Sequence, residues 1–166
     1  TWFTSYGVEV LGVKENVVFC MITATALLFV VFALLAGMIG TRAGRKRTIL
    51  VGLAVFLADL VALALFRLPS LMWLFLAVAG IAWALINVNS ITIVWELARG
   101  NRVGTYTGLY YFASAAAQIS SPPALGLVID RIGMAALFPS ALVFMALAAL
   151  LMLGVRRGES SEATPA

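Results

Sequence analysis

The chain has 166 residues, of which 63% are hydrophobic and 11% are charged, with a net charge of +4 and a mean hydropathy of +1.08. Because charged residues make up about a quarter of a soluble domain, this composition excludes an ordinary water-soluble fold. The absence of histidine, a single cysteine (Cys20) and the lack of a nucleophile–base or acid–base pair argue against an enzyme, a metal site, a cofactor and a disulfide framework.

Five segments are long and apolar enough to cross a bilayer as helices. About 20 residues at 1.5 Å each span the hydrocarbon core, four runs without formal charge exceed this length, and a fifth contains only Asp59. None alternates polar and apolar residues as a transmembrane strand does. We therefore predict an all-α membrane protein with spans at 16–41, 48–66, 68–95, 103–129 and 132–155.

The two ends of the chain differ from these spans. Residues 1–11 begin with TWFTSYG, which we interpret as the outer end of a sixth helix whose body lies upstream. Residues 156–166, RRGESSEATPA, are polar and rich in small side chains. Such a composition predicts a disordered tail.

Residues 37–47, GMIGTRAGRKR, end the first span with four basic side chains and three glycines. Glycine permits a tight turn, and arginine offers five donors and a permanent charge to a carboxylate or a helix C-terminus. We expect Arg42 or Arg45 to contact Glu96 in one state of the molecule; plain anchoring of the topology is the alternative. The residues of this predicted gate are Gly37, Arg42, Gly44, Arg45 and Glu96.

Asp59 is the only acid deep inside a predicted span. An ionised aspartate at the centre of a membrane helix costs about 2.5 to 3.5 kcal/mol, so such a residue is a candidate site for a proton or another cation. A structural role for a neutral Asp59 is the interpretation that we favour.

The span 68–95 carries polar side chains at helical spacing. Trp83, Asn87 and Ser90 share one face, whereas Asn89 lies about 200° around the helix from Asn87. At most one of the two amides should therefore line a shared cavity, and we expect it to be Asn87.

The span 103–129 carries a second polar face, on which Tyr110, Ser114 and Gln118 recur every four residues. Aromatic faces, hydroxyls and amides suit a neutral, polyhydroxylated ligand, although such groups also join membrane helices through hydrogen bonds worth about 0.6 to 2 kcal/mol. The predicted substrate-binding residues are Trp83, Asn87, Tyr110, Ser114 and Gln118.

Two consecutive prolines, Pro122 and Pro123, follow this polar face. Neither has an amide hydrogen, so we expect the helix to bend there. The bend is either a gate or a static kink that fits the bundle.

The basic residues distinguish the two sides of the membrane, because they accumulate in cytoplasmic loops. They flank membrane spans and form no solvated patch, which also argues against nucleic-acid binding. One set of loops holds eight of them and the other set three, which predicts a cytoplasmic C-terminus. The eight are Arg42, Arg45, Lys46, Arg47, Arg99, Arg102, Arg156 and Arg157, and the three are Lys14, Arg67 and Arg131.

A pattern in the first loop recurs 89 residues later: GMIGTRAG begins at Gly37 and GLVIDRIG at Gly126. Three spans separate the copies, so they should lie on opposite faces of the membrane. This pattern indicates an inverted repeat of three plus three helices, an arrangement found in many secondary transporters; a coincidental match of Gly, Arg and Gly in two loops is the alternative.

The segment GMIGTRAGRKR resembles the loop signature of the major facilitator superfamily, Gly-x-x-x-Asp-Arg-x-Gly-Arg-Arg/Lys, between helices eight and nine. Thr41 stands where that signature has Asp. Residues 104–133 are similar to helix eleven of sugar:cation symporters, including the glycoside-pentoside-hexuronide and sucrose-transporter-like groups. The resemblance implies the end of helix seven at 1–11, helices eight to twelve at 12–155 and a cytoplasmic tail at 156–166. It places Asp59 in helix nine, generally a peripheral helix.

The resemblance also implies a function: the C-terminal half of a multi-pass transporter of the cell membrane that works by alternating access. Its expected partners are a small-molecule substrate, a coupling ion, the bilayer and the missing N-terminal half. Sugar uptake with protons or another cation is the first expectation. Efflux of drugs or metabolites and a non-transporting membrane scaffold are the alternatives.

Overall fold

The computed structural model describes residues 2–66, 69–98 and 102–155. Within these ranges the chain is helical and contains no strand, and five helices are long and apolar enough to cross a membrane. The predicted number and order of spans are confirmed. The helices are α1 (Trp2–Glu9), α2 (Glu15–Ala43), α3 (Arg45–Leu65), α4 (Met72–Leu97), α5 (Val103–Ile132) and α6 (Leu137–Gly154), with short 3₁₀ turns at Pro69–Leu71 and Met134–Ala136.

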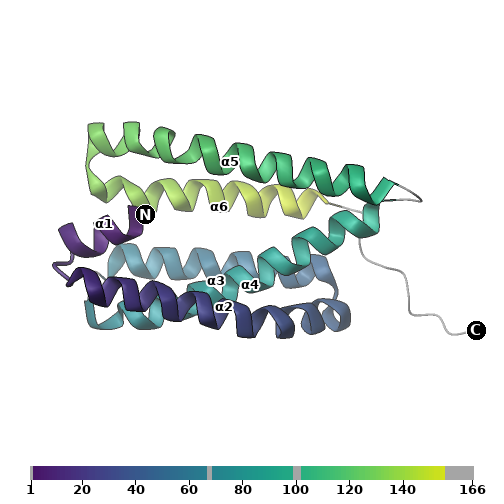
Figure 1. Cartoon of the computed structure of the whole chain (residues 1–166), viewed down its shortest axis with the longest axis horizontal. Helices are drawn as coiled ribbons and strands as arrows, with labels where there is room; N and C mark the ends of the chain where they lie inside the picture. Colours follow the sequence, from purple (N-terminus) through teal and green to yellow (C-terminus); the bar gives the residue numbers. More distant parts are fainter. Residues whose placement is uncertain (1, 67–68, 99–101, 156–166) are drawn as a thin grey trace, which may run out of the picture.

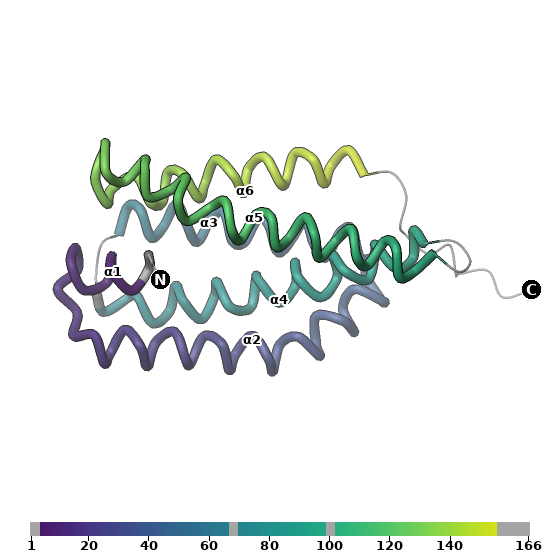
Figure 2. The backbone as a smooth tube through the Cα atoms, turned by 45° about the horizontal axis from the view of Figure 1, so that its top comes forward, coloured from purple at the N-terminus to yellow at the C-terminus, as the bar shows by residue number. Residues whose placement is uncertain are grey.

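The long helices lie side by side along one axis, with α5 and α6 forming one layer and α2, α3 and α4 the other (Figure 1). Helices α2 and α4 end, and α3 and α5 begin, at one end of the bundle, which we call the basic end; α3 and α5 end, and α4 and α6 begin, at the opposite end (Figures 1 and 2). This alternation is the one that the sequence predicted.

Helix α4 packs along both α2 and α3, and α6 packs on α3. Small residues permit this close approach: a methyl group added at Gly52 would lie 3.0 Å from the Ala82 carbonyl oxygen, and one added at Gly80 would lie 3.0 Å from that of Thr25. Such contacts are typical of membrane helices, because lipid offers no hydrophobic driving force between them. In α5 only Ile129 is buried.

Helix α1 is held at the opposite end by an aromatic contact. The rings of Tyr6 and Phe138 meet edge to face at a centroid distance of 4.7 Å, and both side chains are buried with Leu60 and Leu63 of α3. A short helix that would be marginal alone is thereby fixed to α3 and α6.

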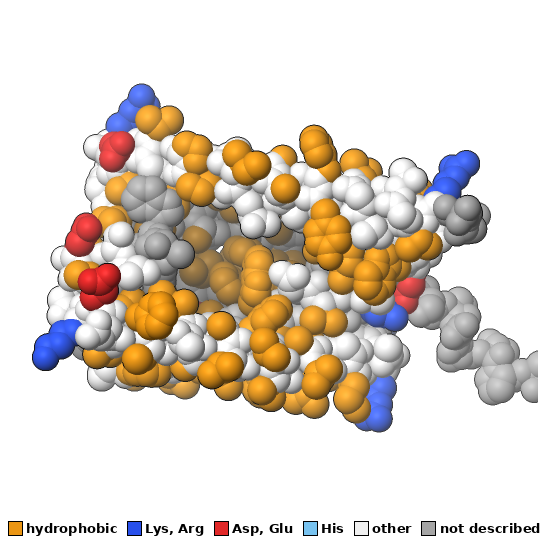
Figure 3. Space-filling view, viewed as in Figure 1, with side chains coloured by type: hydrophobic (Ala, Val, Ile, Leu, Met, Phe, Trp, Pro, Cys, Tyr) orange, Lys and Arg blue, Asp and Glu red, His pale blue; other side chains and the backbone are white. Residues whose placement is uncertain are grey.

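Charged residues gather at the two ends of the bundle (Figure 3). Among the described residues, the basic end has five cations and one acid, Glu96, whereas the opposite end has two cations and three acids. The expected asymmetry is therefore present, while Arg67, Arg99, Arg156 and Arg157 lie outside the described residues. The cations of the basic end are Arg42, Arg45, Lys46, Arg47 and Arg102; the opposite end has Lys14, Arg131, Glu9, Glu15 and Asp130.

The internal repeat is visible in the backbone. When 89 is added to their residue numbers, α2 coincides with α5, and α3 coincides with the Met134–Ala136 turn and α6 taken together. Gly44 and Gly133, which are equivalent under this shift, have φ values of 91° and 92°. The two halves therefore turn through the same kind of glycine at opposite ends of the bundle.

Four helices extend past the limits that the charge pattern predicted, among them α3, which begins at Arg45, and α4, which continues to Leu97. Helix α2 continues to Ala43, and α5 continues through Asp130 and Arg131 to Ile132, before the turn at Gly133. A charge marks where the chain leaves the apolar layer, but a helix ends only where its hydrogen bonding stops. Helix α5 also passes through Pro122 and Pro123 as one uninterrupted helix.

Candidate functional site

The basic end is built around the turn at Gly44. The Gly44 carbonyl accepts a backbone hydrogen bond from Thr48 at 3.0 Å and a second one from its hydroxyl at 2.9 Å. Thr41, which replaces the signature aspartate, donates its hydroxyl to the Met38 carbonyl of its own helix at 2.9 Å. Thr41 therefore forms no lock with another helix here, and the turn directs the start of α3 toward α4.

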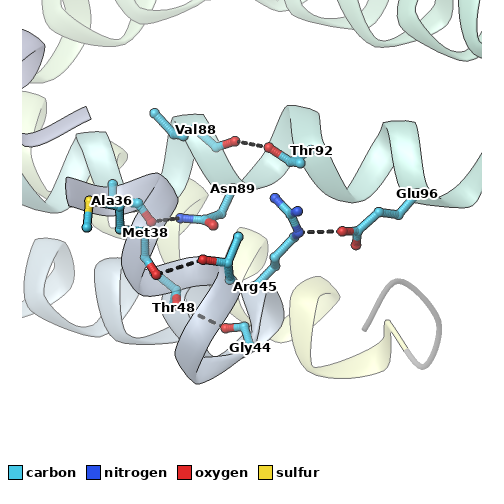
Figure 4. A network of polar contacts seen from close by, with 10 residues as sticks. Ala36, Met38, Gly44, Arg45, Thr48, Val88, Asn89, Thr92 and Glu96 are labelled. Carbon is cyan, nitrogen blue, oxygen red and sulfur yellow. Dashed lines mark hydrogen bonds and ion pairs between the residues drawn. The ribbon is translucent and has the colours of Figure 1, made fainter. Parts of the chain in front are cut away.

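An ion pair joins these helices. Arg45, the first residue of α3, places Nε 2.5 Å from Oε1 of Glu96, near the end of α4 (Figure 4). Both side chains are largely covered, with exposed fractions of 18% and 22%. Arg42 is exposed and forms no salt bridge with any described residue. Of the two arginines expected to contact Glu96, Arg45 is the one that does so.

Lys46 makes a contact that the sequence analysis did not assign. Its Nζ donates to the Leu153 carbonyl at 3.1 Å, near the C-terminus of α6. A cation at this position satisfies an unpaired carbonyl and the partial negative charge of the helix end. The sequence predicts that an arginine of this loop binds a carboxylate or a helix C-terminus, whereas the side chain that binds the helix C-terminus is a lysine.

Asn89 is a second residue whose role the sequence did not reveal. It is completely buried between α4 and α2, and its amide nitrogen donates to the Ala36 carbonyl at 3.1 Å and to the Leu85 carbonyl at 2.9 Å. Asn87, the amide expected to line a cavity, is half-buried. The expectation that the two amides face different surroundings agrees with this arrangement.

A cavity of about 700 Å³ lies between α2, α3, α4 and α6, where Figure 3 shows the surface hollowed between the layers. Its walls are almost entirely apolar, and Trp83 is the one predicted substrate-binding residue that lines it. The ring centroids of Trp83 and Phe56 lie 6.0 Å apart. An apolar, aromatic wall of this kind fits a hydrophobic group or another helix.

The polar face of α5 lies apart from that cavity. Tyr110 and Ser114 are half-buried and Gln118 is exposed, so the described residues do not enclose these three side chains with Trp83 in one pocket. A second cavity of about 250 Å³ lies between α5 and α6, with Pro122 in its wall.

Asp59 is buried in α3, with 7% of its surface exposed. None of the described residues forms a hydrogen bond or an ion pair with its carboxyl group. No group of three or more acidic, histidine or cysteine side chains that could bind a metal is found in the described ranges.

The chain matches the family described as Major Facilitator Superfamily over residues 3–166. Neither the curated proteins nor the solved structures gave a match. The family match agrees with the five apolar helices and the repeated helix pair. The chain is therefore a multi-pass membrane protein that belongs to the Major Facilitator Superfamily, whose members are transporters of small molecules and not enzymes.

Proposed function

We propose that this chain is the C-terminal half of a secondary active transporter of the cell membrane that works by alternating access, with its C-terminus in the cytoplasm. The charge asymmetry between the two ends supports this orientation, because the basic end holds five of the seven described cations.

The observation that carries the proposal is the polar face of α5. Polar side chains exposed at membrane depth are costly unless they line a water-filled path or meet another helix. Gln118 is exposed on α5, in line with the half-buried Tyr110 and Ser114. We infer that this face lines a substrate path shared with a second bundle.

A neutral sugar suits such a surface, because it offers hydroxyls to an amide and a flat apolar face to a tyrosine ring. Uptake coupled to protons or another cation is the proposed direction. Asn87 of α4 is proposed as a further substrate contact, whereas Trp83 lines the apolar cavity and stands apart from this site.

The proposal includes the N-terminal half of the same transporter as a partner. Under the 89-residue shift, α1 corresponds to the end of α4. Because α4 is a complete membrane helix, the repeat predicts that α1 is the end of an equally long helix. The apolar cavity is continuous with the place where Tyr6 packs, since Leu60 and Phe138 belong to both. We propose that the body of this helix occupies the cavity.

The Arg45–Glu96 pair is proposed as the cytoplasmic gate. A largely covered pair is costly to break, so it would stabilise the inner end of this half in one state. Glu96→Gln and Arg45→Gln should each slow transport, and the double variant should be little worse than either. Wild-type rates with normal insertion would reduce the pair to a topological anchor.

The test of the function is radiolabelled uptake by the full-length protein in liposomes, with a panel of sugars and with imposed proton or sodium gradients. Gln118→Ala should reduce uptake, whereas Ile119→Ala, at a neighbouring residue with 76% exposure, should not. Transport only of amphiphilic drugs or metabolites, in the outward direction, would favour the efflux alternative. No flux under any gradient would favour the scaffold.

A further inference from the structure

We propose that Asn89 is a positioning residue for the Arg45–Glu96 pair: its amide fixes α4 against α2 in the one register that brings these two side chains together. Asn89 touches neither partner of the pair, and it acts through the helices that carry them.

Asn89 makes its contacts at the interface between α4 and α2, where a residue that fixes the register of these two helices would have to lie. Its Nδ2 donates across the interface to Ala36 of α2 and within α4 to Leu85. Along α4, Glu96 follows Asn89 by seven residues, which is two turns on nearly the same face. The chain from Ala36 leads through the end of α2 and the Gly44 turn to Arg45 (Figure 4).

Gly40 makes this contact specific. A methyl group added there would overlap the Asn89 side-chain oxygen, so only glycine lets the amide enter the α2 surface at this point. Ala36 and Gly40 are both buried and lie one turn apart on α2. Together they form a small-residue notch into which the Asn89 side chain fits.

The amide group of Asn89 indicates that its role is a directional hydrogen bond rather than packing alone. Its Oδ1 is buried without a hydrogen-bond partner among the described residues. An apolar side chain would bury no unpaired oxygen at this position, whereas an amide adds a directional bond to one carbonyl of α2. Buried polar residues that select one register between helices act in this way.

The inference rests on the proposed function only in treating the ion pair as a gate, so its test measures the pair without transport. Thermal unfolding of the full-length protein in lipid nanodiscs is compared for the natural sequence, Arg45→Gln, Glu96→Gln and the double variant. The set is then repeated with Asn89→Ala. The difference between the double variant and the summed single variants reports the coupling of the two charges.

In the natural background we expect clear non-additivity: the double variant should lower Tm by no more than either single variant. With Asn89→Ala the pair should separate, and the further Tm changes from Arg45→Gln and Glu96→Gln should become additive. If Asn89→Ala lowers Tm but the coupling between Arg45 and Glu96 persists, the proposal is overturned, since Asn89 would then have a packing role alone. Asn89→Leu, which keeps the branched side-chain skeleton but removes the hydrogen bond, replaces Asn89→Ala if the latter does not insert.

Two further variants separate the hydrogen bond from the steric fit. Gly40→Ala alone should lower Tm and abolish the coupling, because it displaces Asn89. Gly40→Ala with Asn89→Ala should recover the Tm lost in Gly40→Ala but not the coupling of Arg45 with Glu96; recovery of both would overturn the proposal.

Thr92→Val is the matched control, because the Thr92 hydroxyl bonds only to Val88 of its own helix at 2.7 Å, and the coupling should persist. Coupling lost without any change in uptake would reject the gate and leave the positioning role intact.

Discussion

Gly44 and Gly133 are 89 residues apart in the sequence, yet each ends a long helix with nearly the same φ, 91° and 92°. Both are followed by the start of a second membrane helix, and they lie at opposite ends of the bundle (Figure 1). The inverted repeat is therefore a property of backbone geometry as well as of sequence, and the two turns should respond alike to substitution.

Replacing either glycine with alanine should destabilise the protein by about 1–3 kcal/mol, because positive φ with extended ψ strains any side chain. Apart from Gly133 itself and its two chain neighbours, no residue has an atom within 4 Å of the position that a Gly133 Cβ would occupy, so the effect there would be backbone strain alone. Gly108→Ala is the control: Gly108 is helical with open space around it, and alanine should stabilise α5 by about 0.5–1 kcal/mol. Thermal unfolding in nanodiscs measures all three variants, and equal effects at Gly133 and Gly108 would contradict the strain argument.

The sidedness of the bundle can be tested with a membrane-impermeant maleimide on intact cells. In a Cys20→Ser background, a cysteine replacing Ala43 at the basic end should stay unlabelled from outside, and one replacing Ala135 at the opposite end should be labelled. Both alanines are exposed, so the comparison reports topology rather than burial. Labelling of both positions from the same side would reject the inverted arrangement.

Asp59→Asn should leave accumulation of substrate against a gradient intact, because we expect Asp59 to have a structural role. Asp59→Leu should raise the free energy of unfolding by about 1 kcal/mol, since it removes a buried polar group that has no partner among the described residues. Uptake assays and unfolding curves check the two statements separately. Equilibrating but non-concentrative transport by Asp59→Asn would instead assign ion coupling to this carboxyl.

Pro123→Ala should lower the turnover number with little change in KM if the double proline is a gate, because alanine restores an amide hydrogen and stiffens α5. Pro139→Ala is the control, since Pro139 lies in the first turn of α6, where a helix loses no hydrogen bond to proline. Initial rates of uptake are the measurement. A wild-type rate for Pro123→Ala would leave the prolines a static role.

The sequence identified the charged residues of the basic end but not how they pair. It named Arg42 and Arg45 as alternatives for Glu96, and the choice depends on the turn at Gly44, after which Arg45 begins α3 beside α4. It assigned a helix-end contact to arginine, whereas Lys46 reaches Leu153, more than a hundred residues away. Such pairings depend on how three helices are placed together, which no local pattern encodes.

The amino-acid sequence by itself determined the membrane setting, the five spans, the asymmetry of charge and the repeated turn, because each follows from composition over a short stretch and from lipid as the solvent. Only the tertiary structure decided which amide is buried, which arginine is paired and where the apolar cavity lies. These depend on the rotation and register of α4 against α2, and a shift of one residue turns a helix by about 100° and exchanges Asn89 for a neighbouring side chain.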